Sequence, residues 1–150
     1  MTPAGLAAPR ELLALVLDTL VPAGGEFPGA GGVALDHVAA MAAASGELAS
    51  LLSQGLLAVE AAAQAEGASG FARLSTDDRE QVLRRVERSH PEFFEALVRQ
   101  TYDGYYSHPL VVERLGLEPR PLHPHGHKIE ATELPDLSRV AGRGPIYRQP

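Results

Sequence analysis

Apolar residues recur every three or four positions along most of the first 115 residues, and this spacing predicts α-helices. The period is clearest between residues 48 and 63, where one helical stripe carries only apolar or small side chains. Shorter stretches of the same kind predict the other helices, over residues 9–20, 33–44, 76–88, 91–106 and 110–115. The sequence therefore predicts an all-α fold, a compact bundle of about five helices plus a short sixth.

Glycine and the helix-capping residues add detail to this pattern. Gly55 shares the 48–63 stripe with leucines, so we expect a neighbouring helix to approach closely there. Ser75 and Asp78 have the spacing of a capping box, with Asp in place of the usual Glu or Gln, and predict a helix start. The segment PAGGEFPGAGG, residues 22–32, is rich in glycine and proline and predicts a loop.

The predicted helix over residues 91–106 contains three of the chain's four tyrosines. Its apolar positions come in adjacent pairs every four residues and define one broad face: Phe93, Phe94, Leu97, Val98, Thr101, Tyr102, Tyr105 and Tyr106. We expect this face to be buried, because tyrosine can bury its ring near a helix end while its hydroxyl reaches a partner or water. Catalysis by these tyrosines is disfavoured, since no acid or base is evident beside them for proton transfer.

The helical period ends at Gly116, and half of the twelve prolines follow it. Large apolar residues nevertheless continue at wide intervals: Leu122, Ile129, Leu134, Leu137, Val140, Ile146 and Tyr147. Such spaced residues are more typical of an extended segment lying on a surface than of a free linker. We therefore predict a helical domain over residues 1–116, and an extended proline-rich tail over residues 117–150 that packs on this domain or on a partner.

Composition excludes several classes of function. The chain has no cysteine, which excludes disulfides and thiolate metal ligands, and its net charge of −6 argues against nucleic-acid binding. No apolar run reaches the ~20 residues that span a bilayer, so no direct membrane insertion is expected. The N-terminus has no twin-arginine pair, and Asp18 interrupts its apolar run, so no export signal is predicted. The compartment stays open between the cytoplasm and a periplasm reached by co-export with a partner.

Two short segments match sequence patterns of known kinds of binding site. GAGGVA, residues 29–34, fits the dinucleotide pattern G-x-G-x-x-A, but no strand precedes it, so a helix start is the better interpretation. His123, His125 and His127 alternate along HPHGH, and on a curved extended segment three imidazoles could hold zinc. The competing interpretation is a solvated or partner-facing loop. No catalytic residue and no cofactor-binding residue is predicted in this chain.

The last twelve residues are basic. Arg139, Arg143 and Arg148 lie there without any acidic residue, beside Ile146 and Tyr147. These side chains could meet an acidic patch on a partner, or they could belong to a solvated tail.

Taken in order, several segments resemble the gluconate 2-dehydrogenase subunit 3 family. They are PAGGEFPGAGGV, a long alanine- and leucine-rich helix, GFARLSTDDREQVL, FFEALVRQTYDGYYSHPLVVERLG and the closing RGPIYR. The most specific part is the phenylalanine pair followed by T-x-x-G-x-Y-S-x-P and LG. The resemblance covers nearly the whole chain.

The resemblance implies a small, gamma-type accessory subunit without catalytic residues. In that family the partner is a large flavoprotein subunit of the glucose-methanol-choline (GMC) oxidoreductase type, which carries FAD and oxidises a sugar or alcohol. A multihaem cytochrome c is often a third subunit, and the small subunit is understood to help the flavoprotein fold, mature or be exported. On this interpretation the partner-binding residues are expected in the tail: His123, His125, His127, Arg139, Arg143, Ile146, Tyr147 and Arg148. Two alternatives stay open, a small metal-binding protein that uses the histidine cluster and a free-standing helical protein without a flavoprotein partner.

Overall fold

The computed structural model describes residues 9–119 and the single positions 138 and 142. The chain divides into two units, residues 1–120 and residues 121–150, and the description below concerns the first. Within the described residues the structure is all-α without a strand, as the sequence predicts. Its elements are α1 (Arg10–Leu20), α2 (Ala30–Val33), α3 (Leu35–Ala44), α4 (Gly46–Ala65), the 3-10 turn η1 (Phe71–Arg73), α5 (Thr76–Ser89), α6 (Pro91–Ser107) and α7 (Pro109–Arg114).

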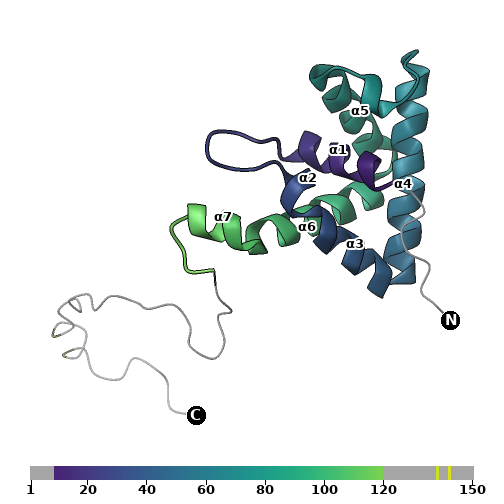
Figure 1. The fold of residues 1–150 in the computed structure, drawn as a ribbon. Coiled ribbons are helices and arrows are strands. Elements are labelled where there is room, and N and C mark those ends of the chain that lie inside the picture. The colour runs from purple at the N-terminus through teal and green to yellow at the C-terminus, as the bar shows by residue number, and fades with distance from the viewer. Residues whose placement is uncertain (1–8, 120–137, 139–141, 143–150) are drawn as a thin grey trace, which may run out of the picture. The chain divides into compact units, whose positions relative to one another are not determined.

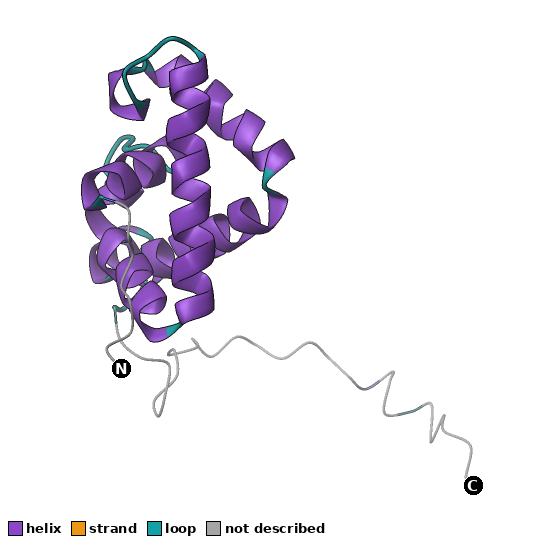
Figure 2. Cartoon of the chain, turned by 90° about the vertical axis from the view of Figure 1, so that its right-hand side faces the viewer, coloured by secondary structure: helices purple, strands orange, loops and turns teal. Residues whose placement is uncertain are grey.

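The long helix α4 forms one side of the helical unit, and α7 lies at the opposite side (Figure 1). Seen from the α4 side, α4 runs across the front of the other helices (Figure 2). It packs against α3, α5 and α6. The core between them is apolar and includes Leu13, Leu17, Leu52, Leu56, Val59, Phe71, Val86, Phe93 and Leu97. No helix among the described residues is long and apolar enough to cross a bilayer.

Gly55 explains how α6 can lie so close to α4. A Cβ atom at this position would overlap the ring of Phe93, which is 2% exposed at the start of α6. The Phe93 ring therefore fills the notch that the missing side chain leaves. The predicted close approach of a neighbouring helix at Gly55 is confirmed.

The start of α5 is capped by Ser75 and Asp78, as predicted. The Asp78 backbone N–H donates to Ser75 Oγ at 3.2 Å, and the Ser75 hydroxyl donates to the Asp78 carboxylate at 2.6 Å. In a standard capping box the acidic side chain reaches back to the backbone N–H of the cap residue. The shorter Asp carboxylate bonds the hydroxyl of Ser75 instead.

The predicted helix over residues 33–44 begins earlier than expected and is divided in two. Its first part is α2, which starts at Ala30 inside the glycine-rich segment, and its second part is α3. The segment GAGGVA therefore contains the start of a helix, in agreement with the interpretation favoured over a dinucleotide-binding turn. Periodicity alone placed the start too late because glycine is a poor helix former.

The predicted buried face of α6 is partly wrong. The buried residues form a narrower stripe of Phe93, Leu97, Thr101, Gly104 and Tyr105. Tyr102 and Tyr106 are 48% and 55% exposed. Neighbouring residues on an α-helix point about 100° apart, so the second member of each adjacent pair lies at the edge of the stripe. Phe94 and Val98 are half-buried at that edge, but further along α6 the edge faces solvent.

Candidate partner-binding site

The glycine-rich loop between α1 and α2, residues 21–29, is held to the helices at its base. The Gly31 backbone N–H donates to Asp18 Oδ1 at 2.7 Å, and the Ala30 N–H donates to the Val21 carbonyl at 2.9 Å. A Cβ atom at Gly29 would overlap the Asp18 carboxylate, and one at Gly31 would overlap the Ala14 carbonyl. Glycine at these two positions therefore lets the start of α2 approach α1 closely enough for Asp18 to bond it.

The loop also has internal order. Gly24 and Phe27 exchange two backbone hydrogen bonds, each 3.0 Å long, and form an isolated antiparallel bridge. Gly25 lies between them with φ of +58°, in the left-handed region that favours glycine. Residues 22–26 are exposed. The tip of the loop is therefore exposed, while the backbone hydrogen bonds between Gly24 and Phe27 fix its conformation.

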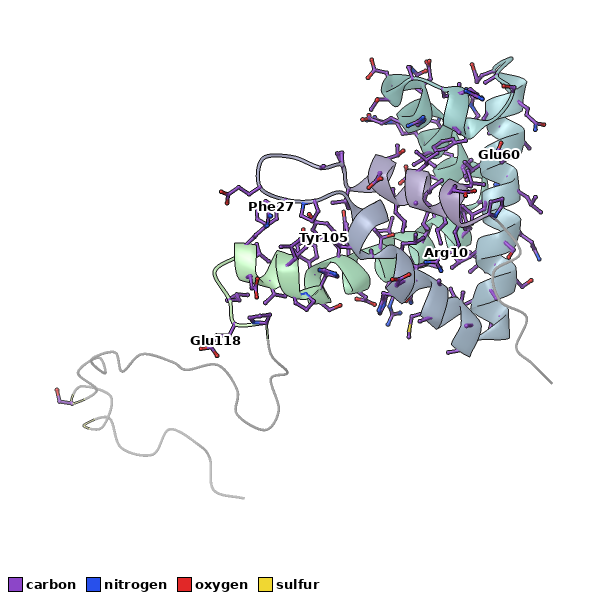
Figure 3. All side chains as sticks on the ribbon, viewed as in Figure 1. Arg10, Phe27, Glu60, Tyr105 and Glu118 are labelled. Atoms are coloured by element: carbon purple, nitrogen blue, oxygen red, sulfur yellow. The ribbon has the colours of Figure 1, made fainter. Side chains whose placement is uncertain are left out.

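Tyr105 connects this loop to α6. Its hydroxyl donates to the Pro28 carbonyl at 2.8 Å, across 77 residues of sequence. Phe27 and Tyr105 lie at the same end of the helical unit, between the loop and the last turns of α6 (Figure 3). Burial raises the pKa of Tyr105 above its ordinary value of 10.0; the nearby Tyr106 acts in the same direction, and Arg114 on α7 opposes both. The hydroxyl therefore stays protonated, as a donor must, at any ordinary pH.

Two exposed tyrosines continue from Tyr105 along the surface of α6. The Tyr105 and Tyr106 rings meet edge to face with centroids 5.2 Å apart, and the Tyr102 and Tyr106 rings do so at 5.9 Å. Such edge-to-face pairs are favourable beyond their buried area and fix the ring orientations. Tyr102 and Tyr106 therefore form an ordered aromatic surface supported by a buried neighbour.

The short helix α7 follows α6 directly and packs against it. Its end is a Schellman motif, in which the Gly116 N–H donates to the Glu113 carbonyl at 2.9 Å and the Leu117 N–H donates to the Val112 carbonyl at 3.1 Å. Gly116 has φ of +76°, as this motif requires. Leu110, Leu115 and Leu117 are each at least 37% exposed. We call the five exposed side chains Tyr102, Tyr106, Leu110, Leu115 and Leu117 the α6–α7 face.

A depression of about 480 Å³ lies beside the base of the loop, lined by Asp18, Thr19, Pro28, Thr76 and Arg79 among others. Both of its charged groups are already bonded within the fold. Asp18 accepts from Gly31, while Arg79 donates to the carbonyls of Phe71 and Ala72 at 3.2 and 2.8 Å. These contacts give both side chains a structural role in joining α1, α2, η1 and α5.

The structure does not describe the site residues predicted from the sequence. His123, His125, His127, Arg139, Arg143, Ile146, Tyr147 and Arg148 are all outside the described residues, so their roles stay predictions. The boundary between domain and tail at residue 117 also stays a prediction. Among residues 9–119, no group of three or more His, Asp or Glu side chains is placed to hold a metal ion.

Sequence reasoning did not find the contacts that hold the loop. One signal was present, because Asp18 is the single charged residue inside the apolar stretch of α1, with the glycine-rich segment a few residues beyond. A lone carboxylate before such a segment is a candidate cap for the next helix. The bond from Tyr105 to Pro28 spans too much sequence for any local pattern to reveal it.

Comparison with known proteins relates the chain to a family. No curated protein and no solved structure matches the chain significantly. Residues 7–121 match the profile of the family described as gluconate 2-dehydrogenase subunit 3, a range that contains the loop, α6 and α7. This protein therefore belongs to the gluconate 2-dehydrogenase subunit 3 family, whose members are small subunits of dehydrogenase complexes.

Proposed function

We propose that this chain is a non-catalytic accessory subunit that binds an FAD-dependent dehydrogenase subunit of the GMC type and stabilises it or helps it mature. The observation that carries the proposal is the family match over residues 7–121. That range contains all the described helices, and Asp18 and Arg79 in it hold these elements together through hydrogen bonds to backbone groups. FAD and the oxidation of a sugar or alcohol belong, in this proposal, to the large subunit. A cytochrome c subunit is a further partner that the resemblance suggests.

Co-expression tests this role directly. The large flavoprotein subunit is produced with and without this chain, and its FAD-loaded soluble yield and dehydrogenase activity are measured. We expect the yield to fall several-fold without this chain, and we expect the purified small chain to show no flavin absorbance after gel filtration. Equal yield and activity in both cultures, with no association between the two chains, would contradict the proposal.

The tail is the second part of the proposal. We expect the histidine cluster at 123–127 and the segment 139–150 to contact the large subunit, since tyrosine and arginine often dominate binding when buried at an interface. Removal of residues 139–150 should leave the helical circular dichroism nearly intact and weaken association more than tenfold, or about 1.4 kcal/mol. An unchanged affinity would place the contact elsewhere, and a collapsed thermal melt would show that the tail belongs to the core.

A further inference from the structure

Exposed large apolar side chains are concentrated at one end of the helical unit. Seven such side chains are exposed among the described residues, and five of them form the α6–α7 face. The other two are Met41 on α3 and Leu57 on α4. Single exposed apolar residues are ordinary on a protein surface, but these five lie within residues 102–117, on two helices that pack together and just after them, and such a concentration favours a contact site.

The backbone beneath this face is firmly held. Tyr105 is bonded to the loop, the rings of Tyr102 and Tyr106 are paired, and the Schellman motif fixes Gly116 and the residues after it. The helix α7 packs against α6. Ordered side chains lose little conformational entropy on binding, so tyrosines held in this way are efficient binding residues.

The charges around the face indicate what it can bind. Four carboxylates lie on the loop tip, on α6, on α7 and just after it, those of Glu26, Asp103, Glu113 and Glu118, and two guanidinium groups lie on α6 and α7, those of Arg99 and Arg114. Their net formal charge of −2 favours a partner surface with an apolar centre and a rim of lysine or arginine. The exposed tyrosine hydroxyls can donate to carbonyl groups on that surface.

We propose that the α6–α7 face, together with the tip of the glycine-rich loop, is the surface on which the dehydrogenase large subunit docks. This inference rests on the proposed function and adds to it the surface that makes the contact. All five side chains of the face lie inside the range that matches the family, residues 7–121. By contrast, the outer surface of α5 carries a dense mixture of charges, Asp77, Asp78, Glu80, Arg84, Arg85, Glu87 and Arg88, which favours contact with water.

The test compares alanine variants in a titration against the host's FAD-dependent dehydrogenase large subunit, purified separately. Tyr102→Ala and Tyr106→Ala should each weaken binding at least tenfold, because central tyrosines are frequent hot spots. Leu115→Ala has a matched control in Leu57→Ala, since Leu57 is 68% exposed on α4, at the opposite side of the helical unit from α7 (Figure 1). We expect Leu115→Ala to weaken binding several-fold and Leu57→Ala to stay within twofold. Circular dichroism melts should be unchanged for Tyr102→Ala.

A charge-reversal variant tests whether the partner surface has a basic rim. Glu26→Lys should slow association at low salt at least threefold, and the difference should vanish at high salt because ions screen exposed charges. Glu87→Lys on α5 makes the same charge change away from the face and should have a much smaller effect.

The outcomes separate the two proposals. If the unaltered chain binds the large subunit and the two tyrosine variants bind equally well, the docking surface is wrong while the accessory role stands. Equal weakening by Leu57→Ala and Leu115→Ala would also overturn the docking surface. If the unaltered chain does not bind at all, the accessory role fails and the docking surface fails with it.

Discussion

Two sides of α6 carry similar aromatic residues in opposite environments. Phe93 is 2% exposed and fills the notch at Gly55, whereas Tyr102 and Tyr106 are about half exposed. Phe93 belongs to the buried stripe that continues to Tyr105, which is 4% exposed, and the two exposed tyrosines lie at the edge of that stripe. The same helix therefore serves the fold with one side and, in our proposal, a partner with the other. Tyrosine suits the exposed side because its hydroxyl can reach water or a partner.

The largest expected effect is the loss of the phenylalanine ring. Phe93→Ala should lower the free energy of unfolding by ~3–5 kcal/mol, because it removes a buried ring and leaves a cavity against α4. Tyr102→Ala on the same helix should stay within about 0.5 kcal/mol, as most exposed substitutions do. Urea unfolding followed by circular dichroism measures both. Similar losses for the two variants would mean that the two sides of α6 do not differ in burial as described.

The notch in α4 gives the next largest effect. Gly55→Ala should destabilise the fold by ~1–3 kcal/mol, because the added Cβ overlaps the Phe93 ring and forces the two helices apart. Gly46→Ala is the matched control, since a Cβ there meets no atom within 4 Å. The control should be neutral or slightly stabilising, because alanine is the better helix former. Thermal melts of the two variants compare them; a stabilised Gly55→Ala would contradict the close contact.

A smaller effect is expected where the buried side of α6 joins the loop. Tyr105→Phe removes the hydrogen bond to Pro28 and should cost ~0.5–1.5 kcal/mol, while Tyr106→Phe, exposed, should cost almost nothing. Because the folded-state pKa of Tyr105 is raised, its contribution is complete below pH 10 and is lost as the pH rises through that higher pKa. Urea unfolding between pH 8 and pH 11 should thus show a fall in stability at high pH that Tyr105→Phe reduces. An identical pH profile for both proteins would contradict this role.

Local patterns predicted most of the helices but only part of the surface. The stripe of α4, with Gly55 in it, and the Ser75 cap depend on residues within a few positions of one another, and the sequence contains that information directly. That the ring of Phe93 fills the notch at Gly55 does not follow from such a local pattern. The exposure of Tyr102 and Tyr106 depends on where α3 and α4 cover α6, which is a property of the packed fold. The Tyr105 bond to Pro28 likewise joins segments that only folding brings together.

Hydrogen exchange of the small chain, alone and in complex with the large subunit, tests the central claim most directly. Amides in the loop, residues 23–27, and in and after α7, residues 110–118, should exchange more slowly in the complex, because docking would suppress the local opening through which these amides exchange. Amides at the two ends of α5 serve as the internal control and should exchange at the same rate in both states. Protection confined to α5, or no protection anywhere in residues 9–119, would contradict the docking of a dehydrogenase subunit on the α6–α7 face.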